Sequence, residues 1–392
     1  MSEQPFEELE NQLTSGGIDA ALETLCEQLK SENKFHELFD ARLMQCRQRA
    51  GAPLARDTQL DNLSETVRDK IEAGYVEACR EVGNLLLETG DLRQAWMYLR
   101  PAGDEERMRE VLAKTEPTDE NLEQVVELSL HEGLNPQRGF AIVLDHYGVC
   151  NAITTYDSAM YSRTVPEKQV AVGQLIARLH ADLIDSLRRD VQGADASSDS
   201  EETLQELVAK CRDSFTEYTY HVDISHLSSV IRMARIIEDE PALRLALDLT
   251  EYGQCLHESL RPPGDTPFED AYRISGLFFA AQLGERVDEA IEYFGERARS
   301  TNVYEEGSAA VEVYVALLSR LGRDKEAIDI TLEHLPHGTP TTGFAPPLME
   351  LSRRAGDFSK LLADCRERGD LLSYAIGRID AAADETVTGN FD

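Results

Sequence analysis

The sequence predicts an all-α protein built from antiparallel helical hairpins. Apolar residues recur at three- and four-residue steps along most of the chain, which is the spacing of one helix face. No run of four or more residues reads convincingly as an alternating strand. Short segments such as Thr89–Asp91, Gly133–Pro136 and Ala355–Asp357 separate the periodic stretches. Consecutive helices should therefore fold back on one another as hairpins.

The individual helices follow from these periodic stretches. Two early helices are marked by apolar residues at helical spacing, namely Leu22, Leu25, Cys26 and Leu29, and then Val76, Cys79, Val82, Leu85 and Leu86. A further helix should begin near Leu122, with Asp119 as its N-cap. Another should span Ile224–Ile237, with Asp223 as its N-cap.

Residues 79–102 carry the clearest hairpin pattern. Gly83 lies in the first helix, Gly90 separates the two helices, and Ala95 follows five residues later. Small residues at Gly83 and Ala95 would let the two helices approach closely. Gly90 would end the first helix in a left-handed conformation, which glycine adopts without strain.

Other parts of the chain repeat portions of this pattern. Gly322 precedes Ala327 by the same five-residue offset, and Gly356 follows Gly322 after 34 residues. The pattern resembles the tetratricopeptide repeat, a family of helical hairpins about 34 residues long. Thr331 and Leu361 depart from the residues that the family pattern favours. The resemblance implies stacked hairpins in a right-handed superhelix, and the work of a scaffold or adaptor without chemistry of its own.

The sequence divides into four expected segments. Repeat-like hairpins should occupy residues 1–117 and 266–381, on either side of an irregular central helical segment, 118–265. A polar, acidic and serine-rich loop is expected at 190–202. The last residues, 382–392, lack an apolar period and should form a disordered tail.

The chain is strongly acidic. Its 392 residues include 39 Lys and Arg against 73 Asp and Glu, which gives a net charge of −34 at pH 7. Such a chain repels phosphate backbones and anionic lipid, so neither nucleic acid nor membrane is an expected partner. A basic or neutral protein or peptide segment is the expected partner. The acidity could also serve only solubility in a salty cytoplasm.

Several features favour a cytoplasmic location. The first residues lack the basic-then-apolar order of a signal peptide, and no apolar stretch approaches the roughly 20 residues that span a bilayer. The seven cysteines are scattered, odd in number and never spaced as CxxC. This pattern favours free thiols over a disulfide framework.

A metal site is one hypothesis for the central segment. His221, Asp223 and His226 are residues of the types that ligate a divalent cation, which is the one cofactor that the residues suggest. His221 and His226 can point the same way only if the helix begins after His221. The alternative is that Asp223 simply caps the following helix.

Four further candidates for ligand binding lie in one polar stretch, at His146, Asn151, Thr154 and Asp157. Asn151 and Thr154 belong to a polar stripe at three- and four-residue steps. His146 shares a helical face with Cys150 if one helix runs through Gly148. Such a stripe could line a ligand groove, or it could be the hydrated face of an amphipathic helix.

His257 and Arg261 complete the candidates for ligand binding. His257 could act as a base beside Glu258, although adjacent helical residues point apart. Arg261 precedes a stiff Pro-Pro-Gly loop, which could hold a binding arginine or simply redirect the chain.

Two functions from different classes therefore remain open. The first is a tetratricopeptide-like interaction protein whose acidic groove binds a peptide or protein segment. The alternative is an enzyme or small-ligand binder, most concretely a metal-assisted hydrolase, with its site in the central segment. No GxGxxG, GxxxxGK[ST], HExxH or GxSxG pattern occurs, so nucleotide binding and the familiar hydrolase chemistries lack motif support.

Overall fold

The computed structural model describes residues 4–54, 63–192, 202–212 and 215–388. These residues form nineteen α-helices and, within the described ranges, no strand; one isolated antiparallel bridge joins Asp265 and Phe268. The predicted all-α class is therefore confirmed. The chain divides into two compact units, one up to Val143 and one from Leu144 onward.

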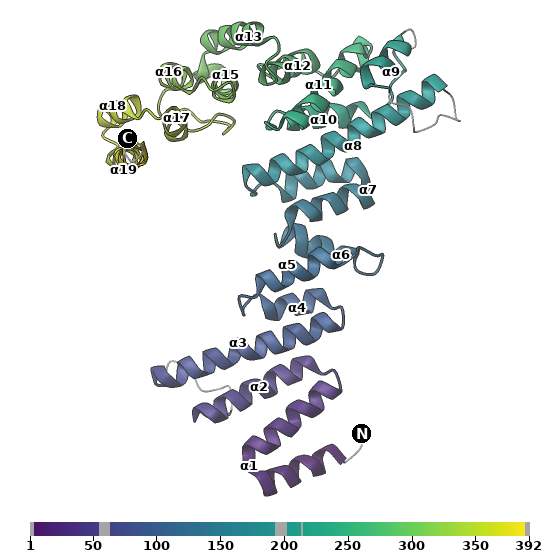
Figure 1. Cartoon of the computed structure of the whole chain (residues 1–392), viewed down its shortest axis with the longest axis vertical. Helices are drawn as coiled ribbons and strands as arrows, with labels where there is room; N and C mark the ends of the chain where they lie inside the picture. Colours follow the sequence, from purple (N-terminus) through teal and green to yellow (C-terminus); the bar gives the residue numbers. More distant parts are fainter. Residues whose placement is uncertain (1–3, 55–62, 193–201, 213–214, 389–392) are drawn as a thin grey trace. The chain divides into compact units, whose positions relative to one another are not determined.

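The first unit contains the helices up to the beginning of α7. They are α1 (Gln4–Ser31), α2 (Phe35–Ala50), α3 (Glu65–Glu88), α4 (Leu92–Leu99), α5 (Glu105–Lys114), α6 (Leu122–Val126), the π-helical turn η2 (Glu127–His131) and α7 (Pro136–Ala159), within which the boundary falls. Helix α1 packs on α2, α2 on α3, and α3 on α4, so that neighbours in sequence are neighbours in space (Figure 1).

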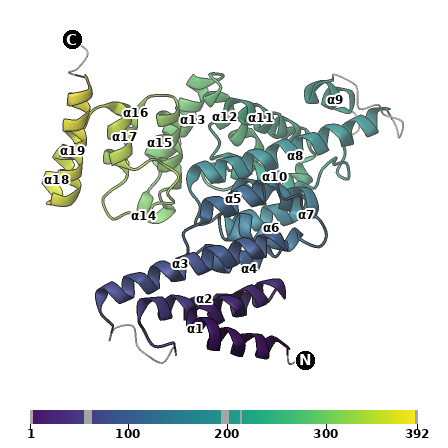
Figure 2. The ribbon, with the colours of Figure 1, turned by 60° about the horizontal axis from the view of Figure 1, so that its bottom comes forward.

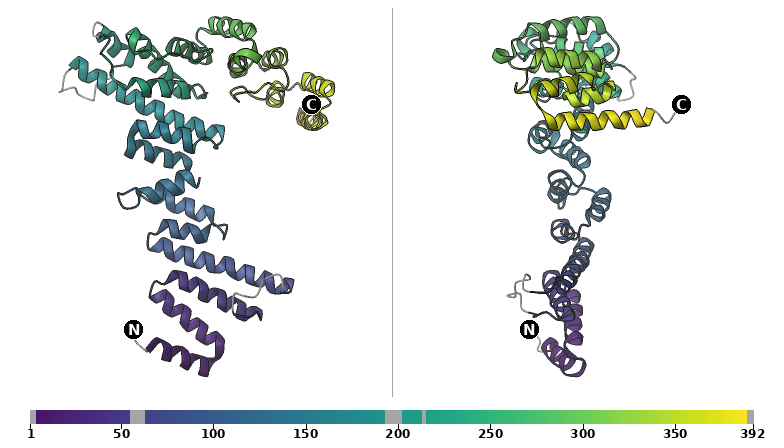
Figure 3. Two further views of the ribbon diagram at one scale, coloured as in Figure 1. Left: turned by 180° about the vertical axis from the view of Figure 1, so that it is seen from behind. Right: turned by 90° about the vertical axis from the view of Figure 1, so that its left-hand side faces the viewer.

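The second unit continues the same helical pattern after α7. Its helices are α8 (Val165–Gln192), α9 (Leu204–Lys210), α10 (Ile224–Ala234), α11 (Glu240–Cys255), the short η4 (Glu258–Leu260), α12 (Ala271–Gln282), α13 (Val287–Ser300), α14 (Val303–Glu306), α15 (Ala309–Arg320), α16 (Asp324–His334), α17 (Leu348–Ala355), α18 (Ser359–Arg368) and α19 (Leu371–Thr388). Pairs such as α11 with α12 and α15 with α16 pack as neighbours (Figure 1). The last two helices, α18 and α19, form another such pair near the C-terminus, in yellow (Figure 3). Helix α8 departs from this order, because it contacts α9, α10 and α11 (Figure 2).

The α3–α4 hairpin confirms the pattern expected at residues 79–102. Gly90 has φ 82°, and the N–H of Asp91 donates to the carbonyl of Leu86, which closes the end of α3. A Cβ atom added at Gly83 would lie 2.7 Å from the Leu99 side chain and 3.4 Å from the Ala95 carbonyl oxygen. The two helices therefore approach closely at Gly83.

The turn after α3 recurs elsewhere in the chain. Gly322 and Gly356 have positive φ values of 72° and 61°, and both follow helix ends. The N–H of the next residue, Arg323 or Asp357, donates to the carbonyl of Leu318 or Ser352, five residues earlier. The hydrogen-bond pattern is the same as that at Gly90, so the sequence similarity between these segments reflects a shared turn.

The core of the first unit gathers side chains from several successive helices. Trp96, the only tryptophan of the chain, is buried there beside Leu86, Leu99 and Leu128. Its indole Nε1 donates to a carboxylate oxygen of Glu132 at 3.1 Å. The polar end of this large side chain is therefore satisfied.

Two arginines with little exposed surface link helices of the second unit. The guanidinium of Arg235 lies 3.7 Å from the ring centroid of Phe268 and forms paired hydrogen bonds with Asp265. Arg320 lies over the Phe278 ring and donates to the backbone carbonyl of Arg235 at 2.7 Å. Burial lowers the pKa of Arg320 to about 10, so its side chain remains charged at neutral pH.

The structure corrects the expected cap of one helix. Helix α6 begins at Leu122 as predicted, but Asn121 is the residue at its N-cap position, and not Asp119. The Oδ1 atom of Asn121 accepts from the Thr118 N–H, and its Nδ2 donates to the Glu116 carbonyl. These bonds close the preceding turn one residue before the helix starts.

Two segments expected to be irregular are partly helical. Helix α19 continues to Thr388, so 382–388 are helical, because a run of alanines after Asp380 extends the helix. Residues 389–392 lie outside the described residues. In the expected loop at 190–202, the first three residues end α8, and 193–201 lie outside the described residues.

None of the helices in the described ranges combines the length and apolar content that crossing a bilayer requires.

Glu312 is a buried carboxylate that fixes the segment after α16. Its two oxygens accept hydrogen bonds from the Ser308 hydroxyl, the N–H and hydroxyl of Thr342, and the N–H of Phe344, at 2.6–3.0 Å. Burial alone would raise the pKa of this carboxyl, but the four donors outweigh it and hold the pKa below its ordinary value of 4.5. The charged form therefore stabilises the fold.

Replacing Gly83 with valine should weaken the α3–α4 contact. The added atoms would overlap Leu99, so we expect the free energy of unfolding to fall by about 2 kcal/mol. Denaturant unfolding followed by circular dichroism measures this change. Glu72→Val, on the exposed part of the same helix, controls for the helix propensity of valine and should change stability by less than about 0.5 kcal/mol. Equal effects of both substitutions would contradict a close approach at Gly83.

Glu312→Gln should destabilise the protein in a pH-dependent way. At pH 7 the glutamine lacks the charge that strengthens these hydrogen bonds, and its NH2 group would face the N–H and O–H donors that now bond to the carboxylate. We therefore expect the free energy of unfolding to fall by about 2–3 kcal/mol. Because the folded pKa is lowered, the contribution of the carboxylate is complete above pH 4.5 and is lost as the pH falls through the lowered value. The difference between variant and parent should therefore shrink in acid. Exposed Glu305→Gln should show neither effect.

Candidate functional site around His221

The strongest candidate site lies where α8, α9, α10 and α11 pack together (Figure 2). Asp190 belongs to the last turn of α8, and Cys211 directly follows α9. His221 precedes Asp223, the N-cap of α10, and Tyr252 lies on α11. The helical packing therefore joins residues that are far apart in the sequence.

The imidazole of His221 is held on several sides. Its Nδ1 lies 3.1 Å from the hydroxyl of Tyr252, and its Nε2 lies 3.3 Å from Oδ2 of Asp190. The backbone N–H of His221 donates to the same Tyr252 hydroxyl at 2.8 Å. The rings of Phe215 and Tyr252 flank the imidazole, with centroids 5.7 and 5.9 Å away. Only 6% of the His221 side chain is exposed, so its orientation is well fixed.

Tyr252 acts here as a neutral phenol. Burial raises its pKa to about 12, although the hydrogen bond from the His221 backbone opposes this effect. When the Tyr252 hydroxyl donates to Nδ1 of His221, the imidazole proton lies on Nε2 and faces Asp190. In this arrangement the neutral imidazole donates from Nε2 to Asp190.

Cys211 brings a third chemical group to this place. The residue is 3% exposed, and burial together with the nearby Asp190 carboxylate raises the pKa of its thiol to about 11. The Asp190 oxygen, the Cys211 sulfur and the His221 nitrogen all lie within 4.8 Å of one another. They are the one group of three such ligand atoms found among the described residues.

The metal ligands predicted from the sequence are only partly assembled. His221, Asp223 and His226 all border one cavity of about 300 Å³, together with Asp182 and Arg189. However, the ligand atoms of Asp223 and His226 do not belong to the group around Cys211.

The carboxylate of Asp223 caps the N-terminus of α10, which confirms the alternative interpretation of this residue. It accepts from the N–H groups of Ser225 and His226 at 2.8 and 3.2 Å. The Ser225 hydroxyl also donates to it, and this bond is the main reason that the pKa of Asp223 is lowered.

The candidates on α7 lie on exposed helix surface. Asn151 donates to the carbonyl of Tyr147 and Thr154 to that of Cys150, so both side chains are bonded to their own helix. Asp157 and His146 are exposed. Gly148 has φ 79° and ψ 177°, so the regular helix breaks between His146 and Asn151. One continuous polar face along this segment is therefore ruled out.

His257 and Arg261 both bond to the backbone at helix termini: His257 at the start of η4 and Arg261 at the C-terminal end of α11. His257 is the N-cap of η4, and its Nδ1 accepts from the Ser259 N–H. Arg261 donates to the backbone carbonyls of Gln254 and Leu256, the latter directly after α11. These contacts give each side chain a local structural role.

Sequence reasoning missed three of the residues around His221, namely Asp190, Cys211 and Tyr252. Asp190 belongs to a segment expected to be a loop, and Cys211 is one of seven scattered cysteines. Their separations along the chain match no local metal-binding motif. Only the packing of α8 against α9 and α11 brings them together.

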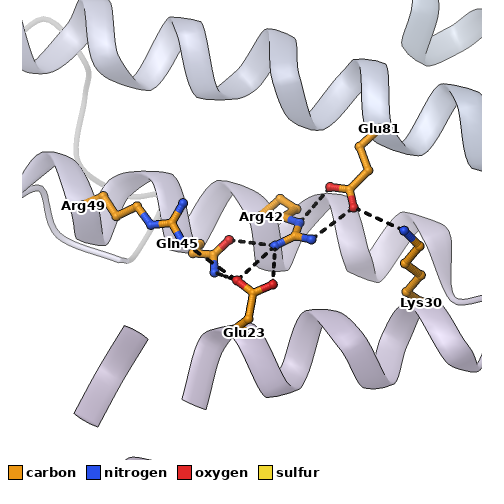
Figure 4. A network of polar contacts seen from close by, with 6 residues as sticks. All are labelled: Glu23, Lys30, Arg42, Gln45, Arg49 and Glu81. Atoms are coloured by element: carbon orange, nitrogen blue, oxygen red, sulfur yellow. Dashed lines mark hydrogen bonds and ion pairs between the residues drawn. The ribbon is translucent and has the colours of Figure 1, made fainter. Parts of the chain in front are cut away.

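A second polar cluster joins α1, α2 and α3 in the first unit (Figure 4). Arg42 forms paired hydrogen bonds with Glu81 at 2.7 and 3.0 Å, and also donates to Glu23 and Gln45. Lys30 and Arg49 lie at the edges of the cluster, each 3.9 Å from a carboxylate.

The Arg42 cluster borders a cavity of about 490 Å³ between α2 and α3. Because Arg42 is already shared by two carboxylates, which raise its pKa, its charge is used within the fold. We therefore regard the cluster as a tie between three helices, and the His221 surroundings as the stronger candidate site.

Tyr252→Phe tests how far the hydroxyl of this tyrosine fixes His221. The substitution leaves the His221 N–H without its acceptor, so the free energy of unfolding should fall by about 1–3 kcal/mol. Denaturant unfolding measures the change. Tyr218, which is 81% exposed, offers the matched control, and Tyr218→Phe should leave stability unchanged. Equal stability of the two variants would show that the hydroxyl of Tyr252 contributes nothing.

No protein-family model matches the chain, and comparisons with curated proteins and with solved structures also gave no match. The residues and contacts described above are therefore the basis for assigning a function.

Proposed function

We propose that this chain is a tetratricopeptide-like interaction protein that binds a basic segment of another protein. The observation that carries the proposal is the large excess of carboxylates on a series of helical hairpins. With 73 acidic against 39 basic side chains, internal ion pairs cannot neutralise the surface, even if every Lys and Arg were paired.

The helical arrangement supports a binding function. In each unit, most helices pack on the helices next to them in sequence, and the same glycine turn recurs after α3, α15 and α17. Such an arrangement buries one face of most helices and leaves the opposite face free, although α12 and α15 are buried on nearly all sides. Repeat proteins of this kind use the free face to bind an extended partner segment.

The charge distribution indicates the chemistry of the partner. Exposed carboxylates occur at the start of α1 (Glu7 and Glu8) and of α5, where Glu105 and Glu106 share one cation, Arg109. Their long-range field attracts a Lys- or Arg-rich segment and repels phosphate backbones and anionic lipid. All seven cysteines are free, which supports a reducing, cytoplasmic environment for the complex.

We prefer this function to a metal-assisted hydrolase at His221, Asp223 and His226. Such an enzyme would need the Asp223 carboxylate as a ligand or a base. That carboxylate instead accepts hydrogen bonds from the first turn of α10.

Affinity purification with the full chain as bait tests the proposal. At 50 mM salt we expect a partner with a Lys- or Arg-rich segment, which should form a saturable complex of defined stoichiometry with the purified chain. Because exposed charges are screened, affinity should fall at least about tenfold at 300 mM salt.

A synthetic copy of the partner segment provides the control for this test. The same peptide with its Lys and Arg replaced by Gln should lose binding at both salt concentrations. Recovery of no saturable partner at low salt, or equal binding by the Gln peptide, would contradict the proposal.

A further inference from the structure

We propose that Asp190, Cys211 and His221 form a binding site for a zinc-like divalent transition metal. The site goes beyond the interaction function proposed above and does not depend on it. Its basis is the convergence of a carboxylate oxygen, a sulfur and an imidazole nitrogen from three separate segments of the second unit.

The distances between these atoms are suited to such an ion. The three ligand atoms lie within 4.8 Å of one another, and Nε2 of His221 is 3.3 Å from Oδ2 of Asp190. Bonds of about 2.0–2.3 Å in tetrahedral geometry place zinc ligands about 3.3–3.8 Å apart. The Asp190 oxygen and the His221 nitrogen already have this spacing. A small movement of the Cys211 side chain would bring its sulfur to the same distance from both.

The ligand types favour one class of metal. Mg²⁺ and Ca²⁺ bind oxygen, and Mg²⁺ also retains several waters. A set of one sulfur, one nitrogen and one oxygen instead suits Zn²⁺ or Co²⁺. With three protein ligands, a fourth position would remain for water or another group.

The surroundings of His221 are those that a ligating histidine requires. Binding through Nε2 places the imidazole proton on Nδ1, which lies 3.1 Å from the Tyr252 hydroxyl. The Tyr252 oxygen would then accept a hydrogen bond from this N–H group, as the outer partners of metal-bound histidines commonly do. The Phe215 ring shields the imidazole on another side.

The charges at the site also suit a cation. On binding, the Cys211 sulfur forms a bond to the metal and its proton passes to solvent, with no change in oxidation state. The resulting thiolate and the Asp190 carboxylate together balance the two positive charges of the ion.

Cobalt substitution provides the primary test, with the full chain. Purified, metal-free protein should bind one Co²⁺ per chain and develop the near-ultraviolet charge-transfer absorption of a cobalt–thiolate bond. Zn²⁺ should displace the cobalt and abolish this absorption. Cys211→Ser should lose the band, whereas Cys150→Ser, at an exposed position of α7, should keep it.

Two further variants distinguish this site from the ligand set predicted from the sequence. Asp190→Asn should weaken cobalt binding at least about tenfold; this side chain is 46% exposed, so the variant should fold even if Cys211→Ser does not. His226→Gln, which alters the neighbouring cavity but none of the three ligands, should leave affinity unchanged.

Three results would overturn the proposal. The first is binding of less than about a tenth of a cobalt ion per chain by the parent protein. The second is a thiolate band that survives in folded Cys211→Ser. The third is binding that Asp190→Asn retains and His226→Gln loses, which would place the metal at the other residues of the cavity.

Discussion

Most helices of this protein bury their apolar side chains against the helices that precede and follow them in the sequence. A single amphipathic helix cannot remove its apolar face from water alone, so each depends on its neighbour. The approach of α3 to α4 at Gly83 shows how closely such a pair can pack. The remaining architecture follows from repeating this contact, with a glycine turn between many of the helices.

The surroundings of His221 depend on an exception to this order. Because α8 is long and contacts α9, α10 and α11, it brings its last turn beside residues much further along the chain. This arrangement fixes the imidazole between Tyr252 and Asp190. In the Arg42 cluster, by contrast, the polar groups of α1, α2 and α3 largely satisfy one another.

Features governed by local chemistry could be predicted from the sequence. The helical class, the turn at Gly90 and the N-cap at Asp223 each depend on a few adjacent residues. The group at Asp190, Cys211 and His221 could not be predicted, because it depends on how α8 packs against α9, α10 and α11. His221 was predicted from the sequence as a metal ligand, but with Asp223 and His226 as the other ligands. The break at Gly148 and the extension of α19 depend on backbone geometry that periodicity does not report.

The position of Trp96 has a practical consequence for studying the two units. This indole is the only one in the chain and is buried in the core of the first unit, so intrinsic tryptophan fluorescence reports on that unit alone. Circular dichroism reports on helices throughout the described chain. A fluorescence transition that coincides with the loss of helicity would mean that the two units unfold cooperatively. Separate transitions would give the stability of the first unit directly, without dissecting the chain.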